Sequence, residues 1–291
     1  MDREQTADRL LTASLEHSYD PDIEIDWSTQ PTPGLLYAPA NRLTLYGTPL
    51  WDRLTDDQQV ELSKHEVASV ASVGIWFETI LMQMLIRRYY HQDPTSRHAQ
   101  YALTEIADEC RHSIMFGRMI EWFGCRPYRV SGVDDQLGRW LKATATGVPM
   151  FAAILIAEEL LDSLQREAAA DESVQPLVRM VSRIHVVEEA RHVRYAREEL
   201  AALVSRSNRA QLAYSRLVIA RAAYATAGKL VHPMAYASVG LDPRAARQVA
   251  RTNPVFGETL RWAGRRVTGF LDELGLIAGP GRTLWERSRL I

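Results

Sequence analysis

The chain has 291 residues, 46% of them hydrophobic and 24% charged, which is the composition of a globular protein with a sizeable core. A formal net charge of −2 excludes a global field that would attract nucleic acid or an anionic membrane. Two cysteines are too few for a disulfide framework and fit a reducing compartment. The N-terminus lacks the apolar segment of a signal peptide, and no uncharged stretch is long enough to span a bilayer. We therefore expect a cytoplasmic protein without a membrane span.

Residues 1–54 show little regular periodicity. Prolines and glycine punctuate this region at Pro21, Pro31, Pro33, Gly34, Pro39 and Pro49. Such residues interrupt helices and strands, so we predict an extended N-terminal arm that wraps a core. The core is expected to be formed by residues 55–291, and the whole chain to be a single domain.

Helical patterns begin at Thr55. Gln58 follows it three residues later, which is the spacing of a capping box. From there, apolar residues recur at helical spacing in segments separated by proline and glycine. The segments predicted as helices are 56–91, 95–123, 137–171, 173–205, 207–228 and 255–275, with an interruption left open at 147–149. Nothing alternates as a strand, so we predict an all-α fold with four long helices in the middle.

A short acidic-Glu-x-Arg-His pattern occurs twice in the chain. It occupies residues 108–112 and again residues 188–192. On a helix, a glutamate and a histidine three residues apart lie on one face, so each pair can bind the same metal ion. One such motif is weak evidence, because a chain of this size often contains one by chance. Two copies on facing helices are typical of a dinuclear carboxylate site in a helix bundle.

Two further carboxylates follow from the spacing of the motifs. The interval from Glu78 to Glu109 is the same as the interval from Glu158 to Glu189. Glu78 and Glu158 both precede their motif inside strongly apolar segments, where an uncompensated carboxylate would be costly to bury. The same register selects Glu158 over its neighbour Glu159, and the apolar periodicity of that segment makes the same choice.

A third imidazole interrupts the repeat. His185 lies four residues before Glu189, whereas the equivalent position of the first half is Glu105. We interpret His185 as a seventh ligand rather than a hydrogen-bonded core histidine, and Glu105 as a residue behind the ligands. The predicted ligands are Glu78, Glu109, His112, Glu158, His185, Glu189 and His192.

Each motif also carries an acidic residue and an arginine at i,i+3 spacing. These pairs are Asp108–Arg111 and Glu188–Arg191. As surface ion pairs they would contribute little, so we favour a role in orienting the ligands. Carboxylates can bridge two cations and imidazole suits iron, which predicts two iron ions. Manganese in the protein as isolated is left open. The competing interpretation is a helix bundle with ordinary salt-bridged surface helices.

The segments RIHVVEEARHVRYAREEL, AEELLDSLQRE and EIADECRH resemble the p-aminobenzoate N-oxygenase (AurF-like) family of di-iron oxygenases. The resemblance covers roughly residues 55–230. It implies a ferritin-like bundle with a seven-ligand di-iron centre at the residues named above, with dioxygen as co-substrate. It also implies oxidation of arylamines to hydroxylamines and nitroarenes, and a homodimer.

The first functional hypothesis is therefore oxygenation of a small molecule, most specifically N-oxygenation of an arylamine, with C–H hydroxylation as the alternative. Residues 66–86, expected along one cavity wall, contain no arginine or lysine, which favours a substrate less anionic than an aminobenzoate. Electrons must come from an external donor, because no flavin or iron–sulfur motif is visible. The additional histidine disfavours a ferroxidase. Phe116, where radical-generating subunits carry a tyrosine, disfavours that class. A non-catalytic helical interaction protein would bind no metal.

Overall fold

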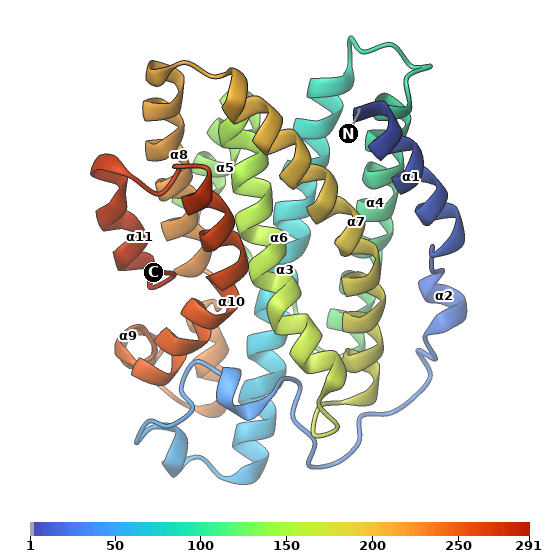
Figure 1. The fold of residues 1–291 in the computed structure, drawn as a ribbon. Coiled ribbons are helices and arrows are strands. Elements are labelled where there is room, and N and C mark those ends of the chain that lie inside the picture. Colours follow the sequence, from blue (N-terminus) through green and yellow to red (C-terminus); the bar gives the residue numbers. More distant parts are fainter. Residues whose placement is uncertain (1–2) are drawn as a thin grey trace.

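The computed structural model describes residues 3–291, and within this range the chain is all-α, as predicted (Figure 1). No strand forms among these residues, and one isolated β-bridge joins Leu36 to Val174. The α-helices are α1 (Arg3–Glu16), α2 (Pro21–Glu24), α3 (Asp56–Tyr89), α4 (Arg97–Trp122), α5 (Gly132–Thr144), α6 (Val148–Ala170), α7 (Pro176–Arg206), α8 (Arg209–Ala227), α9 (Pro243–Thr252), α10 (Pro254–Glu273) and α11 (Arg282–Ser288). Short 3₁₀ helices lie at η1 (Ala40–Arg42), η2 (Trp51–Arg53), η3 (Pro233–Val239) and η4 (Gly279–Gly281).

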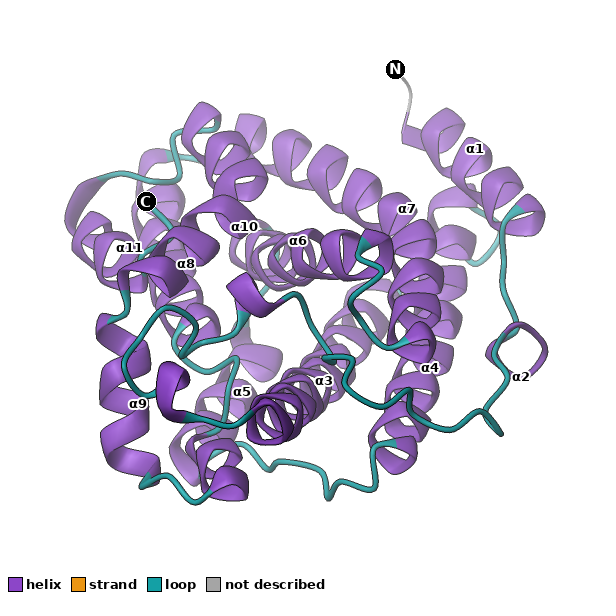
Figure 2. Cartoon of the chain, turned by 90° about the horizontal axis from the view of Figure 1, so that it is seen from below, coloured by secondary structure: helices purple, strands orange, loops and turns teal. Residues whose placement is uncertain are grey.

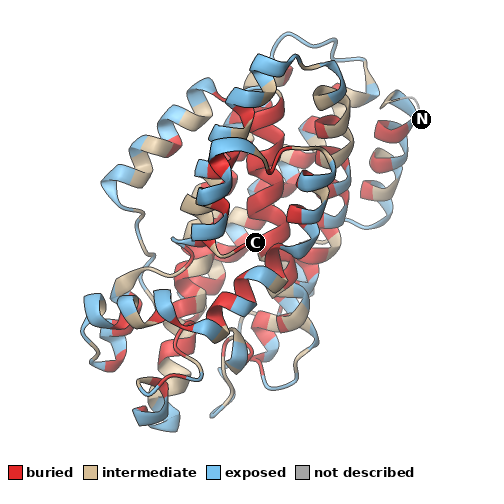
Figure 3. Ribbon diagram, turned by 60° about the vertical axis from the view of Figure 1, so that its left-hand side comes forward, coloured by how far each residue is buried: buried red, intermediate tan, exposed pale blue. Residues whose placement is uncertain are grey.

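Four long helices, α3, α4, α6 and α7, form the ferritin-like bundle. α6 packs along α7, and α3 packs along α4. Seen from below, α6 lies at the centre, with α3, α4, α7 and α10 around it (Figure 2). Helix α1 covers α4 and α7, α8 and α10 cover α6, and α5 lies against α3. Buried residues concentrate on the central helices (Figure 3).

Local sequence signals set the helix boundaries. Thr55 and Gln58 make the predicted capping box at the start of α3. The predicted segment 137–171 divides into α5 and α6 at the interruption left open in the sequence. Gly147 adopts a φ of 60° there, a region that favours glycine, and Pro149 follows within the first turn of α6, where its missing N–H costs nothing.

The predicted extended arm is wrong for residues 3–16, which form α1. Ala7 and Leu10 are buried on one face of this helix, so an amphipathic pattern was present but short and interrupted by polar residues. Most of residues 25–54 is irregular apart from short 3₁₀ turns, and this part lies along the lower end of the bundle (Figures 1 and 2).

The C-terminal region is more helical than its prolines suggested. The predicted segment 255–275 corresponds to α10, and α9 was missed. Proline breaks a helix in its interior, but Pro243 and Pro254 are each the first residue of a helix. Asp242 and Asn253 cap those helices through their side chains. Proline is favoured at the first position of a helix, so these two prolines mark helix starts and not helix ends.

Helix α3 is the one helix in the described range that is long and apolar enough to cross a membrane by length and composition. It is a central helix of the bundle and carries the buried carboxyl groups of Glu66 and Glu78. Packing within the bundle therefore accounts for its apolar length.

Candidate metal centre

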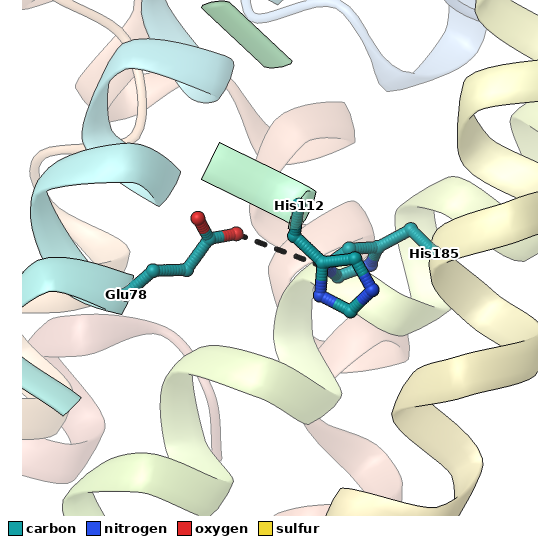
Figure 4. A group of neighbouring side chains, drawn as sticks. All are labelled: Glu78, His112 and His185. Carbon is teal, nitrogen blue, oxygen red and sulfur yellow. Dashed lines mark ion pairs between the residues drawn. The ribbon is translucent and has the colours of Figure 1, made fainter. Parts of the chain in front are cut away.

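The seven side chains predicted as ligands converge in the middle of the bundle. All are at most 3% exposed. Their ligand-type atoms form three overlapping groups, within each of which the atoms lie within 4.8 Å of one another: Glu78, His112 and His185; Glu109, Glu189 and His192; and Glu158, His185 and Glu189. Figure 4 shows the Glu78 carboxylate directed toward the imidazoles of His112 and His185, and its Oε1 lies 3.9 Å from His185 Nε2. Helices α3, α4, α6 and α7 each contribute to the cluster.

Two histidines are held from behind by carboxylates of the opposite motif. His112 Nε2 lies 2.8 Å from Glu188 Oε2, and His192 Nε2 lies 3.2 Å from Asp108 Oδ2. Each acidic residue thus orients the histidine of the other helix and links α4 to α7. The sequence predicted an orienting role for these acidic groups, but the crossed partners depend on how the helices face each other.

The crossed contacts decide which ring nitrogen faces the cluster. With Nε2 engaged, Nδ1 of His112 lies 3.5 Å from Glu109 and 3.4 Å from Glu189. Nδ1 of His192 lies 3.1 Å and 2.9 Å from the same two carboxylates. Glu109 and Glu189 therefore lie between the two imidazoles, at the centre of the group.

Arginines complete this outer layer. Arg111 bonds Asp108 directly, and Arg191 Nη2 lies 3.4 Å from Asp108 and 3.9 Å from Glu188. Arg191 also donates to the His17 carbonyl at 3.0 Å. The same network therefore fastens the segment after α1 to the centre of the bundle.

Several buried polar atoms in the cluster make no hydrogen bond within the described part of the chain. They are both carboxylate oxygens of Glu109, Oε2 of Glu189, Nδ1 of His112 and both ring nitrogens of His185. Leaving such groups unsatisfied costs about 1–3 kcal/mol each. A pair of divalent cations would satisfy these lone pairs and balance the four carboxylates. The donor set of carboxylate oxygens and imidazole nitrogens therefore fits a dinuclear iron centre.

Burial and mutual repulsion shift the protonation of the cluster. Burial and the neighbouring Glu109 raise the pKa of Glu78 to about 8, and burial with Glu189 nearby raises that of Glu158 well above its usual value. Burial opposes ionisation of Glu189 as well, but His192 beside it holds its pKa well below the usual range. Burial and the charge of His112 lower the pKa of His185 to about 4, so its ring is neutral and able to bind metal at neutral pH.

The structure separates Glu158 from Glu159 as the register predicted. Glu158 faces the cluster, whereas Glu159 is buried on another side, where Arg197 donates to it at 2.8 Å and 2.5 Å. Glu105 is buried and belongs to none of the three groups, and burial raises its pKa to about 8.

An inner cavity of about 110 Å³ lies in the bundle next to the cluster. Five of its lining residues stand one helical turn from predicted ligands: Gly74, Phe116, Leu161, Val181 and Ser182. The Phe116 ring lies 4.9 Å from that of His185. The cavity therefore extends along the bundle axis from the histidine-rich side of the cluster.

A larger outer cavity of about 430 Å³ lies between α3, α5, α6 and α8. Leu161, Leu230 and Val231 line both cavities, so the two cavities are adjacent. The outer cavity is mostly apolar, and the cationic side chains lining it are Arg129, Arg221, Lys229 and Arg247. No sequence signal marked these residues, because they come from segments far from the ligand motifs.

Residues 1–275 match the model of the family described as P-aminobenzoate N-oxygenase AurF. Uncharacterized proteins of Mycobacterium tuberculosis and Mycobacterium bovis are 30% identical to the chain. The alignment covers 69% of this chain and 62% of the length of those proteins. Their names state no activity.

Proposed function

Because this chain belongs to the p-aminobenzoate N-oxygenase AurF family, we propose that it is a di-iron oxygenase that N-oxygenates an arylamine to a hydroxylamine or nitro product. The observation that carries the proposal is the convergence of seven buried ligand-type side chains whose unsatisfied atoms face one another. The proposed iron ligands are Glu78, Glu109, His112, Glu158, His185, Glu189 and His192.

The chain's own residues would hold the two ions in an asymmetric cage. Glu109 and Glu189 lie between the two braced histidines and would supply the central carboxylate ligands. His185 would add a nitrogen ligand beside Glu78, and its ring contacts that of Phe116. Bound iron would supply the electrons that reduce dioxygen. The apolar bundle would exclude water from the reacting atoms.

The inner cavity is the proposed place for the reacting part of the substrate. Its one arginine, Arg42, is paired with Glu167, and its carboxyl group, Glu66, is hydrogen-bonded by Thr44. Among its described lining residues no cation is left free to bind a carboxylate. We therefore propose that the reacting end of the substrate is neutral. The same apolar lining favours C–H hydroxylation as the second candidate.

We further propose a homodimer in the cytoplasm that takes electrons from an external donor and binds no nucleic acid. Support for the dimer comes from large apolar side chains that are exposed at the C-terminal end of α3 and on α4: Ile86, Tyr90, Leu103 and Ile114. A second copy of the chain would cover this face. Both cysteines are free, which suits a reducing compartment.

The deciding experiment is iron loading under anaerobic conditions, followed by stopped-flow absorbance on mixing the reduced protein with dioxygen. We expect two irons per chain and a transient absorbance that decays faster with neutral arylamines than with anionic ones. Mass-shifted products under labelled dioxygen would identify the oxygenated atom. Acceleration by a C–H substrate alone would replace the N-oxygenase with the hydroxylase, and mineralised iron without a transient would exclude both.

A further inference from the structure

A group of tyrosines fills the bundle core on the side of the cluster away from the inner cavity. We name Tyr89, Tyr101 and Tyr195, together with His98, the tyrosine column. Tyr195 follows His192 by three residues on α7, so both side chains lie on one face of that helix. Tyr101 precedes Glu109 by eight residues on α4 and is fully buried. The column therefore starts one turn from the proposed ligands.

Ring contacts run without a break along the column. The ring centroids of Tyr101 and Tyr195 are 4.9 Å apart, those of Tyr195 and His98 5.1 Å, and those of His98 and Tyr89 5.5 Å. Tyr89, the last residue of α3, is 8% exposed. The aromatic contacts thus connect the neighbourhood of the cluster with the surface at the upper end of the bundle.

The hydroxyl groups meet at one ring nitrogen. Tyr89 and Tyr195 bond each other, and each hydroxyl lies 3.0 Å from His98 Nε2. Arg3 Nη2 lies 3.0 Å from the same nitrogen. Because an arginine N–H can only donate, this contact places the unprotonated ring nitrogen at Nε2, and its single lone pair accepts from one of these three donors at a time. It is therefore a base within reach of both phenols, and Glu199 Oε1 at 3.6 Å would stabilise it once protonated.

Packing alone does not explain the phenols. The Tyr101 hydroxyl is buried and makes no hydrogen bond to any described residue. A phenylalanine would fill the same space and avoid the cost of burying an unpaired hydroxyl, about 1–3 kcal/mol. Burial also holds the pKa of Tyr101 well above its usual value. The charge of His192 lowers this pKa, and the charge of Glu105 raises it. Removing an electron from such phenols requires that the proton leave too.

We propose that the tyrosine column is an oxidation relay: when no substrate reacts, its tyrosines supply electrons that reduce the oxidised metal centre. The inference rests on the proposed oxygenase function. The Tyr195 phenol would give up one electron to bound iron that dioxygen has oxidised, and its proton would move to His98 Nε2, which would leave a neutral tyrosyl radical. Tyr89 then reduces the Tyr195 radical by transferring one electron and its hydroxyl proton to it. A solvent one-electron reductant such as ascorbate restores Tyr89, and the proton returns from His98.

The relay is tested without substrate. Iron-loaded, reduced protein is mixed with dioxygen and frozen for electron paramagnetic resonance, and peptides are mapped by mass spectrometry for oxidised side chains. We expect a tyrosyl signal in the unmodified protein and at least a tenfold smaller one in Tyr195→Phe. In Tyr89→Phe the signal should persist longer when ascorbate is added. Oxidation should increase in both variants at Phe116, whose ring lies 4.9 Å from that of His185, and at Phe151, whose ring lies 6.3 Å from that of Tyr195.

Tyr236→Phe is the matched control, because Tyr236 is 2% exposed and bonds Thr44 outside the column. It should keep the signal. Iron stoichiometry and circular dichroism confirm that each variant folds and loads. Iron absorbance reports the reaction with dioxygen separately: if iron is not oxidised, the oxygenase proposal fails. If iron is oxidised but the tyrosyl signal is absent, or equal in Tyr195→Phe, the relay is overturned.

Discussion

The two halves of the proposed ligand set, residues 78–112 and 158–192, share one register but differ in what surrounds it. In the first half Ser113 donates to Glu78 Oε2, whereas the equivalent residue of the second half is Val193, and no described residue donates to Glu158. The first half carries Glu105 where the second carries His185. Repetition thus supplies the carboxylate cage, and the differences make its two sides chemically unequal.

The largest expected effect tests the register of the second half. Glu158→Ala removes a carboxylate of the cluster and should abolish dinuclear iron binding. Glu159→Ala removes the partner of Arg197 and should keep both irons with a small loss of stability. Iron per chain, measured after anaerobic loading and gel filtration, distinguishes the two. Loss of iron in Glu159→Ala alone would mean that the register is off by one residue.

The shared register is also what made the site predictable. The two halves repeat one ligand spacing, and together with His185 that spacing selected the seven residues that the structure brings together. Helical periodicity fixes which side chains share a face, and the packing of facing helices brings those faces together. The all-α fold followed from the same periodicity.

What could not be predicted depends on contacts between distant segments. The crossed bonds from Glu188 to His112 and from Asp108 to His192 depend on how α4 faces α7. The cations around the outer cavity come from α8, α9 and loops without a motif. Helix α1 was missed because its stability comes from packing on α4 and α7 rather than from a strong pattern of its own.

Glu66, a buried carboxyl group outside both halves, shows how much burial without a neighbouring cation raises the pKa of a glutamate. Burial raises the pKa of Glu66 to about 7 despite hydrogen bonds from Thr44. Unfolded glutamate titrates near pH ~4.3. Between these values the unfolded chain has lost the proton that the folded chain keeps, so the free energy of unfolding falls as pH rises, by about 3–4 kcal/mol in total.

Glu66→Gln should remove that fall. The measurement is urea unfolding of the metal-free protein and the variant at about pH 4 and about pH 8, from which the difference between the two proteins is taken. Because the other titrating groups are common to both, that difference isolates Glu66. An identical pH dependence in the two proteins would contradict the raised pKa.

The crossed braces should each affect iron affinity. Glu188→Gln and Asp108→Asn leave His112 and His192 without their carboxylate partners, which typically lowers metal affinity about 10–100-fold. Glu188→Gln is expected to cost more, because the Glu188–His112 contact, at 2.8 Å, is shorter than the Asp108–His192 contact, at 3.2 Å. Chelator competition measures both.

Glu198→Gln is the control for the braces, since Glu198 lies on α7 but pairs with the exposed Arg194 at the surface. It should bind iron like the unmodified protein. Unchanged affinity in both brace variants would reduce the crossed contacts to a purely structural role.

The difference between His185 in the second half and Glu105 at the equivalent position of the first half can be tested directly. His185→Ala should fold normally, since alanine favours the helix. It should keep both irons through the six remaining ligands. It should change the lifetime of the transient formed with dioxygen several-fold. Glu105→Ala, the equivalent change in the first half, should leave iron content and lifetime nearly unaltered. An unchanged lifetime in His185→Ala would show that its ring does not bind iron.

The smallest expected effect concerns the hydrogen bond that only the first half makes. Ser113→Ala removes the donor to Glu78 Oε2, and one such bond contributes about 1 kcal/mol, or roughly a fivefold change in affinity. Iron affinity by chelator competition should therefore fall by about that factor. Val193→Thr places a hydroxyl at the equivalent position of the second half, where the repeat predicts that it donates to Glu158 and raises affinity by a similar factor. The double variant should return close to the starting affinity while exchanging the positions of the constrained and unconstrained carboxylates. If Ser113→Ala binds iron unchanged, the asymmetry of the cage lies in His185 alone.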